Sequence, residues 1–407
     1  MKKLIIAEKP SVAKNIADAL KIKTKRDGFF EGDDYIITWA FGHLLQLYDA
    51  KDYDDKMAKW RIEYFPFIPS HFKYKVKNNP RSKGKEDFGA KKQLRTIYTL
   101  IKRQDVEAII SACDYDREGQ IIGDTIIYHG KTQKSVYRLL LNEWTPTEVL
   151  RGLQQLKENT ELKPLQDAGL SRQWADWIIG INLTSVATLK YQKGRGKALN
   201  IGRVLLPTLK IIYDRDNEIE NFVPEDYYML TASFQTAQGD TYQGIYNEKK
   251  KDKFKDRATL ETISQALSSE PVPDALVIDK KVQRKKEYPP YLFNLSNLQG
   301  YITNKYRGWT SDKVLKVAQS LYEKKFITYP RTASVVLEES LAEKAANVLN
   351  KLKKGLHYEN DIRFTKSKRV FNNTKVQSHS AIIPTYLIPK TLTMDETIVY
   401  EAIKRRF

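Results

Sequence analysis

Cysteine and long apolar runs are nearly absent from this sequence of 407 residues. Cys113 is the only cysteine, which excludes an intrachain disulfide and any zinc site built from a cysteine cluster. The apolar residues Leu4–Ala7 are followed at once by Glu8 and Lys9, too early for a signal peptide or a membrane-spanning helix. We therefore expect a cytoplasmic protein that has no membrane partner.

Acidic residues are also fewer than basic residues. The sequence has 69 lysines and arginines against 50 aspartates and glutamates, a formal net charge of +19. Such an excess favours a polyanionic partner, with DNA or RNA ahead of an anionic membrane. Hydrophobic residues make up 41% of the chain, which is typical of a folded protein, and this length allows two to four domains.

The first part of the chain alternates between strand and helix patterns. Lys2–Ala7, Asp34–Trp39 and Ala108–Ala112 are short apolar segments typical of buried strands, and Ser11–Leu20 has the apolar spacing of a helix. Strands that alternate with helices predict an α/β domain with a largely parallel sheet over residues 1–150.

The pattern changes several times after residue 150. Alternating residues with two glycines over 227–246 predict antiparallel strands, and Ala275–Lys281 resembles a strand that returns to them. A helical domain is expected after Pro289, and in it Ser296 and Ser311 are suitable N-caps.

Acidic residues cluster directly after two of the predicted strands. Asp114, Asp116 and Glu118 follow one strand, and Glu8 and Lys9 follow the first. Parallel strands place such loops at one sheet edge. Crowded carboxylates repel one another unless a cation neutralises them, and their hard oxygens suit Mg²⁺. The alternative is a solvated acidic turn, but the combination of both loops resembles the TOPRIM fold of topoisomerases, primases and some nucleases.

Tyr329, Pro330 and Arg331 form the second chemical motif, and they follow a helical pattern. Pro330 restricts the backbone and should end any helix there. A phenol that attacks a phosphodiester needs a cation on the non-bridging oxygens, and a guanidinium suits this role. The phosphotyrosine product would conserve the ester bond for resealing without ATP. The alternative is a surface turn in a helical domain.

The segment Ile327–Ser334 resembles the active-site signature of type IA DNA topoisomerases, most closely topoisomerase III, and the resemblance runs along the whole chain. It implies a multidomain α/β and α+β toroid, incomplete here because chains of this family continue beyond Phe407, so that we expect a fragment or a truncated product. The implied parts are a TOPRIM domain (1–150), a helical domain with a single-strand groove (151–215), a β-rich hinge domain (216–280), a helical domain with the tyrosine (281–395) and the start of the return into the hinge domain (396–407).

The resemblance also implies roles for single residues. Tyr329 would be the nucleophile that forms a 5′-phosphotyrosine and releases a 3′-hydroxyl, and Arg331 would hold the scissile phosphate. Glu8 would donate a proton to the leaving 3′ oxygen, and Lys9 would contact the phosphate. The ligands of Mg²⁺, needed more for rejoining than for cleavage, would be Glu8, Asp114, Asp116 and Glu118.

Further residues are implied in DNA binding. His379, in a His-Ser-Ala-Ile-Ile-Pro-Thr segment, would contact the DNA backbone near the active site. Arg172 and Arg203 would line the single-strand groove. Trp174 is a candidate for stacking on bases, although its spacing from Trp177 is more typical of core packing.

Three positions depart from the family pattern. Ala333 stands in place of an aspartate, Leu205 in place of a common glutamine, and Ser380 where topoisomerase III often has a second histidine. The tyrosine, arginine, lysine and acids are all retained, so we expect an active enzyme.

The leading hypothesis is an ATP-independent isomerase that cuts one DNA strand, passes another through the break and reseals it, so that it relaxes negative supercoils or decatenates DNA. The expected partners are single-stranded and negatively supercoiled DNA and a helicase, and we expect a monomer. Two alternatives stay open: a TOPRIM nuclease or primase, which would leave no protein on the DNA, and a catalytically impaired remnant that only binds single-stranded DNA.

Overall fold

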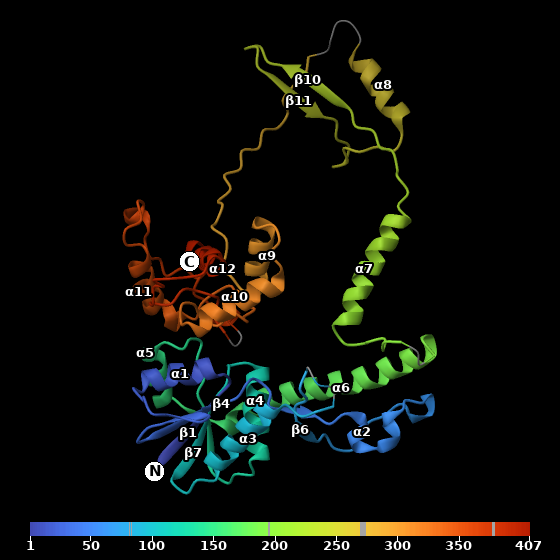
Figure 1. Cartoon of the computed structure of the whole chain (residues 1–407). Helices are drawn as coiled ribbons and strands as arrows, with labels where there is room; N and C mark the ends of the chain where they lie inside the picture. Colours follow the sequence, from blue (N-terminus) through green and yellow to red (C-terminus); the bar gives the residue numbers. More distant parts are fainter. Residues whose placement is uncertain (81, 83, 194–195, 269–273, 377–378) are drawn as a thin grey trace. The chain divides into compact units, whose positions relative to one another are not determined.

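The computed structural model describes residues 1–80, 82, 84–193, 196–268, 274–376 and 379–407, and these fall into two compact units. Met1–Arg203 and Pro289–Phe407 together form the first unit, and Val204–Tyr288 forms the second (Figure 1). Within these ranges no helix is both long enough and apolar enough to cross a membrane. The finer predicted division into domains stays a prediction.

The first unit is built on a sheet with the strand order β2-β3-β4-β1-β7-β8-β9. Its strands β4, β1, β7 and β8 are parallel, and Ile5 of β1 lies between Ile37 and Ile110. The largely parallel sheet predicted from sequence is present, with short antiparallel strands at both edges. The bounds are β1 (Lys2–Ala7), β2 (Lys25–Arg26), β3 (Phe29–Glu31), β4 (Tyr35–Trp39), β7 (Val106–Ala112), β8 (Ser135–Arg138) and β9 (Lys157–Glu158).

Helices cover both faces of this sheet. Ile5 and Ala7 point into the core that α1 and α5 share, whereas Leu4 and Ile6 point into the core under α3 and α4. Because successive strand side chains alternate between faces and both faces are covered, β1 reads as one continuous apolar run. The bounds are α1 (Pro10–Ala19), α3 (Phe88–Ile101), α4 (Arg117–His129) and α5 (Pro146–Gln154).

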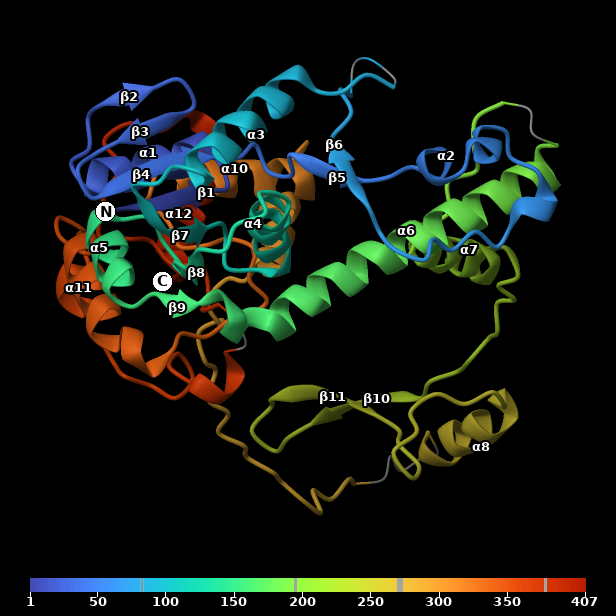
Figure 2. The ribbon, with the colours of Figure 1, turned by 90° about the horizontal axis from the view of Figure 1, so that it is seen from below.

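The segment that contains β5, α2 and β6 lies beside the long helix α6 (Lys163–Tyr191) (Figure 2). Trp174 stacks on Phe72 at 4.9 Å between ring centroids, and Trp177 meets the same ring edge-on. Both tryptophans therefore pack against this segment, and stacking of Trp174 on bases stays a prediction. The bounds are β5 (Leu45–Leu47), α2 (Ala50–Tyr53) and β6 (Tyr74–Val76), with short 3-10 helices at Asp55–Ala58, Ile62–Tyr64 and Asn159–Leu162.

The helices that follow residue 289 pack in two cores, one that includes Phe293 and Leu321 and a second that includes Leu337 and Ala345. Their bounds are α9 (Leu295–Lys305), α10 (Ser311–Glu323), α11 (Ala342–Leu352) and α12 (Met394–Arg406), with short 3-10 helices at Glu339–Leu341, Glu359–Asp361 and Asn373–Lys375. The N-caps of α9 and α10 are Asn294 and Thr310, so the prediction of Ser296 and Ser311 was wrong.

Residues 396–407 lie almost entirely in α12, which packs on α9 and α10, and their expected role as the start of a return into the hinge domain stays a prediction. Thr393 forms a capping box with Glu396 that starts the helix, and Val399 and Ile403 are fully buried in the shared core. One apolar face is enough to hold this helix against its neighbours.

The second unit holds α7 (Leu205–Glu220), the β10–β11 hairpin and α8 (Arg257–Leu267). The strands β10 (Thr231–Gln235) and β11 (Thr241–Ile245) are antiparallel, as predicted. Ala275–Lys281 is described but has no regular structure, so the predicted strand is wrong there: an apolar segment becomes a strand only when a neighbouring strand pairs with it.

Candidate active site

The loop after β7 carries the first acidic group of the site. The Asp116 carboxylate caps α4, because the Gly119 backbone N–H donates to Oδ1 at 2.7 Å. A Cβ on Gly119 would lie 2.1 Å from the backbone oxygen of Asp114. Only glycine therefore allows the loop to fold this tightly, which holds the acids at the carboxyl end of the strand.

The loop after β1 meets the loop after β7 at the same edge of the sheet. The backbone N–H of Asp114 donates to Glu8 Oε2 at 3.2 Å, and both side chains are buried. Burial, and next the charge of Glu8, raise the pKa of Asp114 well above its usual value, while Lys9 acts against them. Lys9 Nζ lies 3.7 Å from Glu8 Oε1 and 3.4 Å from Glu323 Oε1 at the end of α10.

Tyr329 lies against these acids although it is more than two hundred residues away in the chain. Its hydroxyl donates to Asp116 Oδ2 at 2.6 Å, and its backbone N–H donates to the Asn142 carbonyl at 2.8 Å. The side chain is only 2% exposed. Burial, followed by the charges of Asp114 and Asp116, raises the pKa of Tyr329 far above its ordinary value, so the phenol is protonated in this arrangement.

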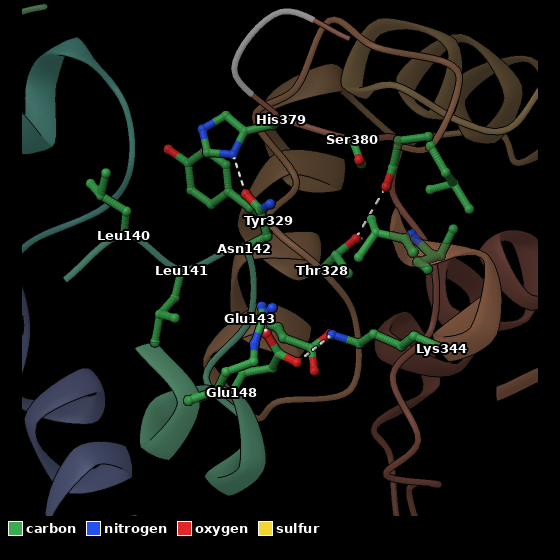
Figure 3. A pocket seen from close by; sticks show the side chains of 15 residues that line it. Leu140, Leu141, Asn142, Glu143, Glu148, Thr328, Tyr329, Lys344, His379 and Ser380 are labelled. Atoms are coloured by element: carbon green, nitrogen blue, oxygen red, sulfur yellow. Dashed lines mark hydrogen bonds and ion pairs between the residues drawn. The ribbon is translucent and has the colours of Figure 1, made fainter. Parts of the chain in front are cut away.

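The His379 ring packs on Tyr329 with 4.6 Å between centroids. Its Nδ1 pairs with Asn142 Oδ1 at 2.6 Å (Figure 3). Its Nε2 pairs with the Tyr115 carbonyl. Both ring nitrogens are thus engaged within the protein in this arrangement, and burial lowers the pKa of His379. Contact with DNA stays a prediction, and it would require these two bonds to be exchanged.

Sequence reasoning missed Asn142, which bonds both Tyr329 and His379. A usable signal exists, because Asn142 follows β8, the next parallel strand, and the carboxyl ends of such strands gather polar groups at one edge. It also missed Arg138, a fully buried arginine whose Nη2 donates to the Asp114 carbonyl at 3.2 Å. Arg138 thereby supports the acidic loop from beneath.

A cavity of about 70 Å³ lies beside Tyr329, lined in part by Asn142, Glu143, Lys344 and His379. Figure 3 shows Lys344 reaching across it to the acids of the opposite wall, and its Nζ lies 3.0 Å from Glu143 Oε2. Arg331 is exposed, and its positive charge lowers the pKa of Tyr329, against the larger effect of burial.

Glu118 lies apart from the other acids. Its Oε2 is 3.3 Å from His43 Nε2 and its Oε1 is 3.5 Å from Arg172 Nη1. Among the residues that the structure describes, no three potential ligands are gathered around one point. Glu8 and Asp114 nevertheless have the oxygen donors that Mg²⁺ prefers. The raised pKa of Asp114 shows that its negative charge is unfavourable there, and a bound cation would neutralise that charge.

Arg172 and Arg203, the predicted groove residues, share one acid. Arg203 Nε and Nη2 donate to the two Asp176 oxygens at 2.7 and 3.2 Å, and Arg172 Nε lies 3.8 Å from Asp176 Oδ2. All three side chains are 40–45% exposed. The arginines therefore face solvent side by side, where a phosphate can reach them.

Comparison with known proteins identifies the family of this chain. The profile of a family described as DNA topoisomerase matches residues 160–407, and the Toprim domain profile matches residues 3–144. The chain belongs to the type IA DNA topoisomerase family. The topoisomerase profile covers the part with Tyr329 and the groove arginines, and the Toprim profile covers the acidic loops.

Individual topoisomerases are similar along the whole chain. DNA topoisomerase 3 from Staphylococcus aureus, in strains NCTC 8325 / PS 47 and MRSA252, is 35% identical over 416 residues, covering 100% of this chain and 55% of each relative. The chain thus spans about half the length of the curated relatives it matches. Full-length topoisomerase I from Thermotoga maritima matches with a TM-score of 0.65 and 27% identity, covering 99% of this chain and 60% of that chain.

Proposed function

We propose that this chain carries the cleavage and rejoining centre of a type IA DNA topoisomerase of the topoisomerase III kind, which acts without ATP. The observation that carries the proposal is the hydrogen bond from the Tyr329 hydroxyl to Asp116. It brings a nucleophile from one end of the chain to the acidic loops of the Toprim domain, with Lys9 and Arg331 as nearby cations.

In the cleavage step the Tyr329 oxygen attacks the scissile phosphorus, and the bond from phosphorus to the 3′ oxygen breaks. Asp116, already hydrogen-bonded to the phenol, accepts its proton, and Glu8 gives a proton to the leaving 3′ oxygen. Lys9 and Arg331 balance the negative charge on the non-bridging oxygens. Rejoining is the reverse: the 3′-hydroxyl attacks the 5′-phosphotyrosine, and the phenol is released.

Mg²⁺ is part of this proposal, with Glu8, Asp114 and Asp116 as ligands and Glu118 joining them after it leaves its ion pairs. When bound, the cation supplies positive charge that neutralises these carboxylates and the DNA phosphate during rejoining. The neutralisation would also weaken the hold of Asp116 on the Tyr329 hydroxyl.

The proposed substrates are single-stranded segments of negatively supercoiled or catenated DNA, bound in the cytoplasm by a monomer that works with a helicase. The net charge of +19 and the paired arginines near α4 support a nucleic-acid partner. The alternative of a catalytically impaired chain that only binds single-stranded DNA stays a weaker candidate. The retained Tyr329–Asp116 pair favours a chain that can still react with DNA.

The test uses single-stranded oligonucleotides labelled at the 5′ or 3′ end, incubated with the chain and denatured in detergent. We expect a covalent adduct on the 5′ end of the downstream fragment, absent from Tyr329→Phe. Tyr322→Phe is the matched control, because the buried Tyr322 ring packs on Tyr329 with 5.3 Å between ring centroids. The variant removes only the Tyr322 hydroxyl and should leave the adduct intact. Binding without any adduct would refute the proposed chemistry.

A further inference from the structure

The Arg172 guanidinium contacts two acidic side chains, one beside the predicted DNA groove and one in the predicted cation site. One of them, Asp176, also holds the second groove arginine, Arg203, through two short bonds. The other, Glu118, is one of the predicted ligands of Mg²⁺ and lies 3.5 Å from Arg172 Nη1. The same guanidinium thus connects the predicted DNA groove to the acidic loop.

This proximity is built into the packing of two helices. Where α6 crosses the start of α4, a Cβ on Gly169 would lie 2.5 Å from Ile121 Cγ2 and 2.9 Å from the Arg117 carbonyl. Because glycine lets the helices approach this closely, Arg172, about one turn further along α6, reaches Glu118 in the first turn of α4.

The contacts of Arg172 are easy to exchange. Its distances of 3.5 and 3.8 Å are longer than those of Arg203, and Arg172, Glu118 and Asp176 are each 40–41% exposed. Exposed ion pairs of this kind contribute little stability. A phosphate, which accepts a bidentate guanidinium with stronger charge-assisted bonds, can therefore displace Glu118.

We propose that Arg172 exchanges Glu118 for a DNA phosphate, and that the released Glu118 joins Asp114 and Asp116 in binding a divalent cation. Binding of single-stranded DNA then strengthens cation binding at the acidic loop. This inference rests on the proposed function, and it adds an order of events: the cation site is completed only when DNA occupies the groove.

The physical reason is a balance of charge around Glu118. In the free chain the carboxylate is held between His43 Nε2 and Arg172 Nη1, so a cation that recruits it must break these contacts. A DNA phosphate that binds Arg172 breaks the contact between Arg172 and Glu118 before the cation binds. Because linkage is reciprocal, the cation must strengthen DNA binding by the same factor.

The test measures Mn²⁺ binding to the full chain, from the electron paramagnetic resonance signal of free Mn²⁺, with and without a saturating single-stranded oligonucleotide. We expect DNA to tighten Mn²⁺ binding by about fivefold or more. In Arg172→Gln we expect tighter Mn²⁺ binding without DNA and a much smaller gain on adding it. In Glu118→Gln the gain should be lost.

Arg203→Gln is the matched control, because Arg203 pairs with Asp176 rather than with Glu118. It should weaken DNA binding, yet at saturating DNA it should keep the full gain in Mn²⁺ affinity. An equal gain in Arg172→Gln and the unchanged chain would overturn the exchange. The adduct assay separates the two proposals, since an adduct without coupling refutes only the exchange, and the absence of any adduct refutes the proposed chemistry.

Discussion

At the scale of single residues, the site brings the proposed nucleophile and the proposed proton acceptor together in a buried acidic setting. Tyr329 donates to Asp116, and the charges of Asp114 and Asp116 oppose ionisation of the phenol. In this state the tyrosine is held in place and kept unreactive. In the proposed mechanism, Lys9, Arg331 and the bound phosphate would change this balance before attack.

Replacement of Asp116 by asparagine should keep a hydrogen-bond acceptor for Tyr329 but remove the proton acceptor. We expect the yield of covalent adduct per unit time to fall by about 10²-fold or more. Glu118→Gln is the control, because it removes a carboxylate of the same loop that contacts His43 and Arg172. Both are assayed without metal, and equal loss in the two variants would exclude Asp116 as the base.

At the scale of elements, the helices after residue 289 are joined to the Toprim sheet by a shared apolar core and also by charge. Lys344 on α11 lies 3.0 Å from Glu143 and 3.2 Å from Glu148, and the Glu143 side chain is only 2% exposed. Glu396 on α12 accepts from Ser320 of α10 at 2.7 Å and from Lys324 at 2.6 Å. These contacts hold the elements that carry Tyr329.

Lys344→Met should leave Glu143 buried without its cation. Because an unpaired buried charge is costly, we expect a loss of about 2–3 kcal/mol in the free energy of unfolding, measured by urea denaturation. Lys351→Met on the same helix is the control: its Nζ donates to the Tyr386 carbonyl at the surface, and it should cost far less. Glu143→Gln combined with Lys344→Met should recover part of the loss, and no recovery would contradict the pairing.

Glu396 should make stability depend on acid pH. Burial acts to raise its pKa, but hydrogen bonds from Lys324 and Ser320 outweigh burial and lower the pKa to about 2. A carboxylate with a lowered folded pKa stabilises the protein above its unfolded pKa of about 4.3, and this contribution is lost as the pH falls toward 2.

The Glu396→Gln variant should therefore lose about 1–2 kcal/mol at pH 7 and show a smaller difference from the unchanged chain at pH 3, by thermal unfolding. Glu401→Gln is the control on the same helix, since its pair with Lys404 is partly exposed. A loss of equal size at both pH values would count against this assignment.

At the scale of the whole molecule, charge dominates the expected behaviour. The chain carries +19 and exposes Arg172 and Arg203 beside α4, so DNA binding should release counterions. Strand passage would further require the helices with Tyr329 to move away from the Toprim sheet, which breaks the Lys344 contacts. The chain spans about half of its curated relatives, so passage by this chain is tested separately from cleavage.

Single-strand affinity should fall by about tenfold or more when the salt concentration rises from about 50 to 200 mM, as measured by fluorescence anisotropy. Arg203→Gln should reduce the slope of log affinity against log salt by about 0.7, the value for one phosphate contact on a single strand. An uncharged methylphosphonate oligonucleotide is the control and should lose most of the salt dependence. A flat response with ordinary DNA would contradict binding through phosphates.

The sequence by itself determined several local elements and where the candidate reactive groups lie in the chain. The apolar run Lys2–Ala7 predicted β1, and the spacing before Tyr329 predicted a helix that the structure places as α10. Both follow from neighbours in the chain, because side-chain periodicity and proline chemistry act within a few residues. The resemblance to topoisomerases then identified the acidic loops and the tyrosine together.

Only the tertiary structure decided how distant groups pair. It bonded Asn142 to both Tyr329 and His379, and it brought Glu118 into contact with Arg172. It also left Ala275–Lys281 without a strand partner. Such outcomes depend on which surfaces pack against each other across hundreds of residues, and local pattern carries no information about that docking.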